Sequence, residues 1–303
     1  MSQLASGKAW AIRLTQILNK VPGIERFPVD VKALAQDYSR QCFSDPITMV
    51  KGERLDGFEG ALYRSKGAKP MWSIVYNDSL SVPGRINFVL AHEFGHYLRH
   101  RQELDEFFCS QRDVTQWDRE DAARESDANQ FASYLLMPID DFRKQILGQT
   151  IDLDLLGHCA DRYGVSLTAA TLKWLEFTEQ RALLVAAREG YILWAKPSER
   201  ALKSGAYIRS KGLVVPVPSG SVAGGAFGDS ELRAPVALPA GVWFPNEPVT
   251  EMTIVSDRFD MTLSLLLLQD QHSAAQLDEE PEEDLLDKMT ESHSIRHAGW
   301  RAS

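Results

Sequence analysis

The stretch PGRINFVLAHEFGH, residues 83–96, decides the fold of the chain around it. Its apolar approach, residues 85–91, contains no helix-breaking residue, and Pro83 stands where the first turn of a helix tolerates proline. Ser81 is the candidate N-cap, because a serine hydroxyl can accept a hydrogen bond from a free N–H of the first turn. The sequence therefore predicts a helix that runs through His92 and His96.

The two histidines have the spacing of a zinc site. Positions i and i+4 share one helix face, so both imidazoles can bind a single Zn²⁺. Glu93 lies about 100° around the helix from His92, beside the metal but outside its ligands. A carboxylate there can take a proton from a water that the metal has made more acidic. The alternative is that the motif occurs by chance in a helix that binds nothing. Gly95 argues against this alternative: glycine weakens a helix interior, so its presence suggests that another backbone or a ligand must approach closely there.

A third ligand is expected from a second amphipathic helix over residues 122–138, which ends near Pro138. Glu125 shares a face with its apolar stripe, and a carboxylate on a buried face needs a partner or a metal. We therefore predict Glu125 as the third zinc ligand, with Asp127 towards the edge or the solvent face. Asn129, one turn later, is a candidate to hydrogen-bond a ligand, with an ordinary surface amide as the alternative. The stripe consists of Ala128, Phe131, Ala132 and Leu135.

Two separated blocks of this sequence resemble the ImmA/IrrE metallo-endopeptidases. Residues 85–96 are similar to the family pattern R-x-x-F-x-x-A-H-E-x-G-H, and residues 125–138 to E-x-E-A-N-x-F-A-x-x-L-L-M-P. The resemblance extends more weakly from about residue 10 to residue 180. One departure is Asp127, where the family usually has glutamate.

The resemblance implies a specific set of roles. It implies that His92, His96 and Glu125 bind zinc and that Glu93 is the catalytic base, in agreement with the helical-face argument. It also implies a protein substrate, because family members typically cut a partner transcriptional repressor. Aspartate is shorter than the glutamate usual in the family at position 127. This difference does not affect metal binding if the residue is not itself a metal ligand.

Composition favours a cytoplasmic globular protein. The 303 residues are 44% hydrophobic, enough for a packed core, and carry a net charge of −9. The sequence shows neither a signal-peptide core nor an apolar run long enough to cross a membrane. Its three cysteines, Cys42, Cys109 and Cys159, are odd in number and far apart, which argues against a disulfide framework.

The predicted fold class is α+β. Residues 1–180 are expected to form a zincin-like peptidase domain, in which the motif helix packs on a small sheet beside a helical subdomain. Helices are predicted at 9–19 and at 31–40, the latter capped by Asp30. Strands are predicted at 47–50, 57–63 and 72–76. Residues 72–76 are assigned as the template to which an extended substrate adds, the alternative being that these strands merely cover the helix.

Residues 150–178 resemble a helix-turn-helix, with Gly164 supplying the left-handed turn and Ser166 the next N-cap. The segment has few cations against several acids, so we favour a structural or partner-docking pair of helices over direct DNA binding. A smaller β-rich domain of unknown role is expected over 181–270. Acidic residues crowd the segment 271–303, which is predicted to be a disordered tail. The β-prone runs of the C-terminal domain are 182–187, 191–195, 205–218, 242–244, 252–259 and 261–268.

Two residues beside the motif receive no catalytic role. His100 follows His96 by one turn and could approach the site, but it ends a charged segment, and we expect it at the surface. Tyr97 could in principle stabilise an oxyanion, but it points away from His96 by one residue step. The sequence does not locate the group that stabilises the oxyanion.

The function predicted from these observations is a cytoplasmic zinc-dependent endopeptidase that cleaves a helix-turn-helix repressor, with Glu93 as general base. The alternative is a non-catalytic regulatory protein, antitoxin-like or anti-repressor-like, that uses the peptidase scaffold to hold a partner. No membrane association is expected. The complete set of His92, Glu93, His96 and Glu125 favours catalysis, because a pure binding protein has no need of Glu93.

Overall fold

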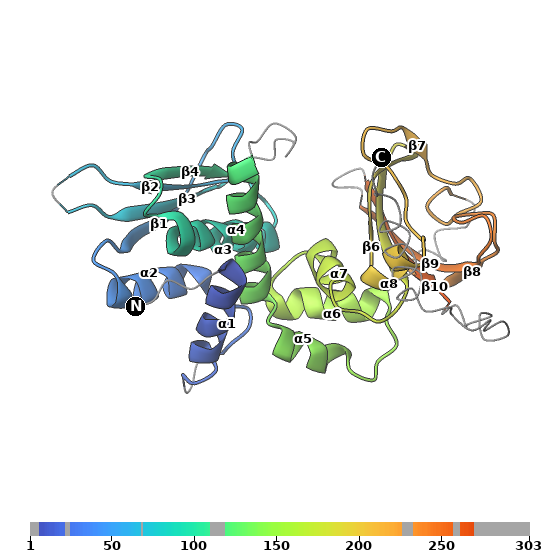
Figure 1. Ribbon diagram of the computed structural model, residues 1–303, viewed down its shortest axis with the longest axis horizontal. Coiled ribbons are helices and arrows are strands. Elements are labelled where there is room, and N and C mark those ends of the chain that lie inside the picture. Colours follow the sequence, from blue (N-terminus) through green and yellow to red (C-terminus); the bar gives the residue numbers. More distant parts are fainter. Residues whose placement is uncertain are drawn as a thin grey trace, which may run out of the picture. The chain divides into compact units, whose positions relative to one another are not determined.

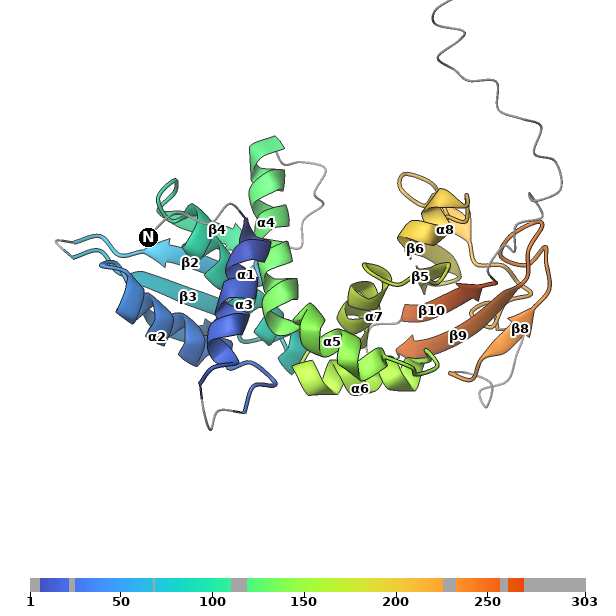
Figure 2. The same cartoon turned by 60° about the horizontal axis from the view of Figure 1, so that its bottom comes forward.

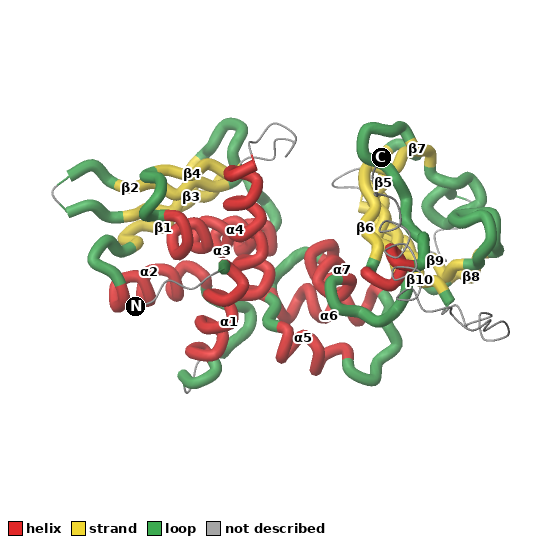
Figure 3. Tube along the Cα trace, viewed as in Figure 1, coloured by secondary structure: helices red, strands yellow, loops and turns green. Residues whose placement is uncertain are grey.

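A computed structural model describes residues 6–21, 25–67, 69–109, 119–225, 233–256 and 261–269 of the chain. The fold is mixed α+β, as predicted, with helices and strands shown in Figure 3. The part up to Leu268 forms one compact unit. The predicted acidic tail, 271–303, lies outside the described residues, and the predicted division at residue 180 stays a prediction. None of the described helices is long and apolar enough to span a bilayer.

The first sheet has four strands in the order β1-β3-β2-β4. β3 pairs in parallel with β1 and antiparallel with β2, and β2 pairs antiparallel with β4. Because β3 has neighbours on both sides, it cannot accept a further strand, and the assignment of residues 72–76 as a substrate template is wrong. The strands are β1 Ile47–Glu53, β2 Gly60–Arg64, β3 Trp72–Asn77 and β4 Glu106–Cys109.

Helix α3, Pro83–His100, carries the His-Glu-x-x-His motif and packs on β2 and β3 (Figure 1). Pro83 occupies the start of the helix, as predicted. The N-cap is Val82 rather than Ser81, and no side chain caps this end. Proline explains how the helix begins without a capping side chain: its missing N–H removes one of the donors that a cap would satisfy.

Three more helices surround α3. Helix α1, Gly7–Leu18, lies alongside α4, Arg119–Leu136 (Figure 2), and α2, Val31–Cys42, packs against β1 and α3. Asp30 caps α2 as predicted, accepting a hydrogen bond from the N–H of Ala33. The predicted apolar stripe of α4 is fully buried, its members being Ala128, Phe131, Ala132 and Leu135.

The helix-turn-helix-like segment forms as the sequence indicates. Helix α5, Ile139–Ile146, precedes α6, Leu153–Tyr163, and α7, Leu167–Leu175. Gly164 adopts a left-handed conformation with φ of 60°, and the Ser166 hydroxyl caps α7. A residue with a Cβ is strained at that φ, so glycine is needed to join the two helices.

The second sheet has six strands in the order β7-β6-β5-β10-β9-β8, all antiparallel to their neighbours. Most of the residues 205–218, and all of 242–244, lie outside strands, so the β-prone pattern was misleading there. One hydrophobic core joins the first sheet and its helices to β5 and β10. A second core is formed by other residues of the six-stranded sheet together with Ala201, Ala206, Trp243 and Phe244. The elements are β5 Ala182–Arg188, β6 Tyr191–Pro197, α8 Glu199–Lys203, β7 Val215–Pro216, β8 Val236–Leu238, β9 Val249–Ser256 and β10 Met261–Leu268.

Candidate metal centre

Three potential metal ligands converge where α3 faces α4. The Nε2 atoms of His92 and His96 lie 3.0 Å apart, and the carboxylate of Glu125 reaches them at 3.1 Å and 3.2 Å. Donor atoms of a tetrahedral zinc site with bonds of about 2.0–2.2 Å lie roughly 3.3–3.6 Å apart, so the observed spacing is close to that of a zinc site. Both histidines are 1% exposed, which keeps solvent from competing for their nitrogens.

A close approach of the two helices makes this convergence possible. A Cβ on Gly95 would lie 3.0 Å from the Phe131 ring of α4, tighter than an ordinary contact. Glycine at this position therefore lets α4 come near enough for Glu125 to reach both imidazoles. The sequence indicated a close approach at Gly95 but not which element makes it.

The carboxylate of Glu125 is held in its charged form. Burial raises its pKa, but hydrogen bonds from His92 and His96 and their charges outweigh burial and lower the pKa to about 2. Burial lowers the pKa of His96, with Glu125 opposing this effect. A charged carboxylate and neutral imidazoles are the protonation states in which these groups bind a metal.

Asn129 lies one turn beyond Glu125, with its Oδ1 3.0 Å from the Nδ1 of His92. An amide oxygen can only accept, so the Nδ1 of His92 donates, and in the neutral ring the Nε2 would then offer its lone pair to a metal. Asp127, by contrast, is outside the cluster and accepts hydrogen bonds from the Gly7 N–H and from Arg99.

Glu93 is completely buried beside the cluster, and no residue in the described part of the chain forms a hydrogen bond with either of its oxygens. Burial, reinforced by the negative charge of Glu125, raises the pKa of Glu93 well above its ordinary value. Strand β2 approaches it closely: a Cβ on Gly60 would lie 2.8 Å from the Oε1 of Glu93 and 2.5 Å from a methyl group of Val89. Sequence reasoning missed Gly60, which belongs to neither motif.

His100 corrects a prediction. It is 4% exposed rather than at the surface, and its Nδ1 lies 3.1 Å from the Nδ1 of His96. Phe107 of β4 stacks on the His96 ring, with 4.7 Å between the two ring centroids. The i, i+4 spacing of His96 and His100 did indicate that His100 could approach the site, but the flanking arginines favoured the surface, and that choice is wrong.

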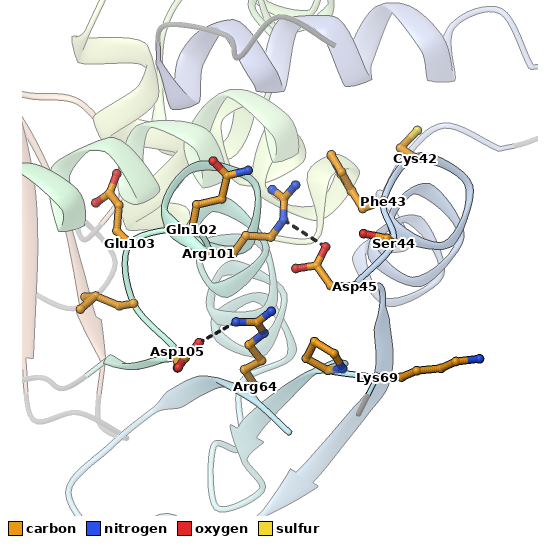
Figure 4. Close-up of a pocket in the computed structure, with 12 residues that line it drawn as sticks. Cys42, Phe43, Ser44, Asp45, Arg64, Lys69, Arg101, Gln102, Glu103 and Asp105 are labelled. Atoms are coloured by element: carbon orange, nitrogen blue, oxygen red, sulfur yellow. Dashed lines mark hydrogen bonds and ion pairs between the residues drawn. The ribbon is translucent and has the colours of Figure 1, made fainter. Parts of the chain in front are cut away.

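A large cavity among the described residues lies away from the cluster. It measures about 1010 Å³ and contains two ion pairs, Arg101 with Asp45 at 3.6 Å and Arg64 with Asp105 at 3.0 Å (Figure 4). Since these charges compensate each other, the cavity offers no concentrated charge. A smaller cavity of about 350 Å³ is lined by both Glu125 and Asn129 and therefore opens beside the metal cluster.

Comparison with known proteins agrees with the motifs. Residues 48–175 match the sequence model of the peptidase M78 family, described as the IrrE N-terminal-like domain. This match confirms the resemblance to the ImmA/IrrE family. A similar solved structure is a Mycobacterium tuberculosis transcriptional regulator, 16% identical, with a TM-score of 0.52 over 88% of this chain and 77% of that one. This likeness concerns the fold alone. No curated protein matches the sequence significantly.

Proposed function

We propose, from the premise that residues 48–175 form an ImmA/IrrE-type metallopeptidase domain, that this chain is a zinc-dependent endopeptidase of zincin-like architecture. The observation that carries the proposal is the combination of three convergent ligand atoms with a buried, unpartnered Glu93. His92, His96 and Glu125 would hold the ion. When bound there, zinc would act as a Lewis acid that makes a water molecule a better nucleophile at neutral pH.

Glu93 is the group that moves protons. Its buried carboxylate accepts a proton from the attacking water and later delivers it to the leaving amine. A raised pKa favours this role, because a carboxylic acid that keeps its proton more readily can return it to the amine. No described residue donates a hydrogen bond to either oxygen of Glu93, so the lone pairs of both oxygens are available to a water.

Substrate access is proposed along β4. Among the described strands, β4 has a neighbour only on the β2 side, and its Phe107 stacks on His96. An extended substrate that adds to this edge would run beside the metal cluster. This proposal replaces the role predicted for residues 72–76.

The proposed substrate is a transcriptional repressor with a helix-turn-helix domain, and the proposed location is the cytoplasm. The family resemblance supports this substrate class. A non-catalytic binding protein on the same scaffold is disfavoured. Glu93 is buried without a partner among the described residues, which destabilises the fold, and holding a partner protein does not require it.

The metal is tested on the purified protein. We expect about one Zn²⁺ per chain by mass spectrometry of the metal, as a site with three protein ligands and an open position requires. His92→Ala should remove most of the zinc, whereas His158→Ala, which changes an exposed histidine of α6, should not. Equal zinc in both variants would exclude the proposed centre.

Cleavage is tested with repressors encoded by neighbouring genes. Incubation of the zinc-loaded protein with the correct repressor should give two fragments, and the Glu93→Gln protein should give none. If no neighbouring regulator is cut, the proposed substrate class is wrong. If the Glu93→Gln protein cuts as fast as the wild type, the proposed mechanism is wrong.

A further inference from the structure

His96 has a second buried partner, on the side of its ring away from Glu125. His100, one turn further along α3, places its Nδ1 3.1 Å from the Nδ1 of His96. The Nε2 of His100 in turn lies 3.8 Å from the carboxylate of Asp127 on α4. The three side chains form a continuous polar chain that leads from a proposed zinc ligand to the neighbouring helix.

The protons on His96 and His100 have one arrangement that is consistent with a metal on His96 and with the acceptor Asp127. Two ring nitrogens in contact share one proton, so one ring donates and the other accepts. Binding of a metal to Nε2 of His96 leaves the proton of that neutral ring on Nδ1. His100 must then accept with its Nδ1 and carry its own proton on Nε2. That proton points towards Asp127, whose carboxylate only accepts.

We propose that His100 is a positioning residue that accepts the Nδ1 proton of His96 and thereby presents the Nε2 of His96 to zinc, with the negative charge of Asp127, 3.8 Å from the Nε2 of His100, favouring the His100 tautomer that carries its proton there. This inference rests on the proposed function, because it takes His96 as a zinc ligand. His92 has equivalent support from Asn129. Each histidine of the motif thus has a separate acceptor behind it.

Asp127 is itself held firmly. Its Oδ1 accepts from the Gly7 N–H at 2.6 Å, and its Oδ2 accepts from Arg99 at 2.6 Å. A Cβ on Gly7 would collide with the backbone oxygen of Asp127, so glycine permits this contact. Gly7 begins α1, which precedes residues 48–175, so the support of the metal centre extends beyond the segment that matches the family.

The first experiment measures zinc affinity by competition with a chelator. His100→Phe keeps a ring of similar size but removes the acceptor, and we expect affinity to fall about 10–100-fold, as is typical for groups behind a ligating histidine. His100→Asn restores an acceptor oxygen close to the Nδ1 position and should recover most of the loss. The same two substitutions at exposed His158 are the matched controls and should leave affinity unchanged.

The second experiment needs no variant and therefore does not depend on the folding of His100→Phe. Nitrogen-15 histidine spectra of the zinc-loaded wild-type protein should show His96 with its proton on Nδ1 and His100 with its proton on Nε2. A proton on Nδ1 of His100 would overturn the proposal, because two donors would then face each other.

The outcomes separate this inference from the proposed function. If the wild-type protein binds no zinc, the proposed metal centre fails, and the inference fails with it. If it binds zinc and His100→Phe binds within twofold of it, only the positioning role is refuted. An affinity of His100→Asn as low as that of His100→Phe would also refute it, because lost packing rather than a lost acceptor would then explain the effect.

Discussion

Two buried glutamates, Glu93 on α3 and Glu251 on β9, show how the same side chain serves different ends in two regions of the molecule. Both are completely inaccessible to solvent. The carboxylate of Glu251 accepts hydrogen bonds from two backbone N–H groups, an indole N–H and a hydroxyl, whereas within the described ranges neither oxygen of Glu93 has a partner. The donors to Glu251 are Val222, Ala223, Trp243 and Thr253.

The difference teaches that burial alone does not identify a functional carboxylate. Glu251 joins the backbone at Val222 and Ala223 to β9, so its buried charge is compensated and its role is structural. Glu93 carries the cost of burial without that compensation. Such a carboxylate beside a candidate metal cluster is what the proposed role of Glu93 as general base requires.

The largest expected effect is the loss of cleavage activity when Glu93, but not Glu251, is replaced. Glu93→Gln should lower the cleavage rate by a factor on the order of 10³, because it removes the base. Zinc content should stay unchanged, because no ligand is altered. Cleavage assays and metal analysis on one preparation measure both. Loss of zinc in this variant would mean that Glu93 is a ligand and that the comparison is wrong.

The same substitution at the other glutamate should act on stability. Glu251→Gln replaces an acceptor by a donor that faces other donors, and we expect it to lower the free energy of unfolding by about 1–3 kcal/mol. Urea denaturation of both variants measures this difference. Zinc content and the cleavage rate of the folded protein should not change. An unaltered unfolding midpoint would show that the four hydrogen bonds contribute little.

The smallest effect is a dependence of stability on pH in the zinc-free protein. The pKa of Glu93 is raised by burial, so above its ordinary value of 4.5 the unfolded chain releases the proton before the folded protein does. Wild-type stability should therefore decrease relative to Glu93→Gln as the pH rises above about 4.5, and the difference should be constant below that pH. Denaturation at several pH values in chelator measures it; a difference independent of pH would contradict the raised pKa.

Much of the candidate metal centre could be predicted from periodicity. Spacing along α3 predicted that His92 and His96 share a face, and the apolar stripe of α4 predicted that Glu125 turns towards the core. These inferences concern residues within a single helix, where geometry is fixed by the helical repeat. Periodicity also placed His100 one turn after His96. The charged residues beside His100 nevertheless suggested a solvent-exposed side chain, although α4 covers it.

Contacts between distant segments were less predictable. The pairing of β3 with both β1 and β2 depends on the order of strands in the sheet, which the β-prone pattern of residues 72–76 does not contain. Residues 205–218 show the opposite error: their composition favours strands, but only Val215–Pro216 pairs with a neighbour. Strand formation depends on partners elsewhere in the chain, so local composition is a weak guide to it.

The close approach of Gly60 to Glu93 has a consequence for how this protein can change by mutation. Every amino acid that replaces glycine adds a Cβ, and at position 60 that Cβ would collide with both the Val89 side chain and the Glu93 carboxylate. If the proposed catalysis holds, substitutions at position 60 are a route by which a lineage could lose it while its entire histidine and glutamate signature survives. A search of genomes for the motif alone would count such descendants as active, and the residue at position 60 would tell them apart.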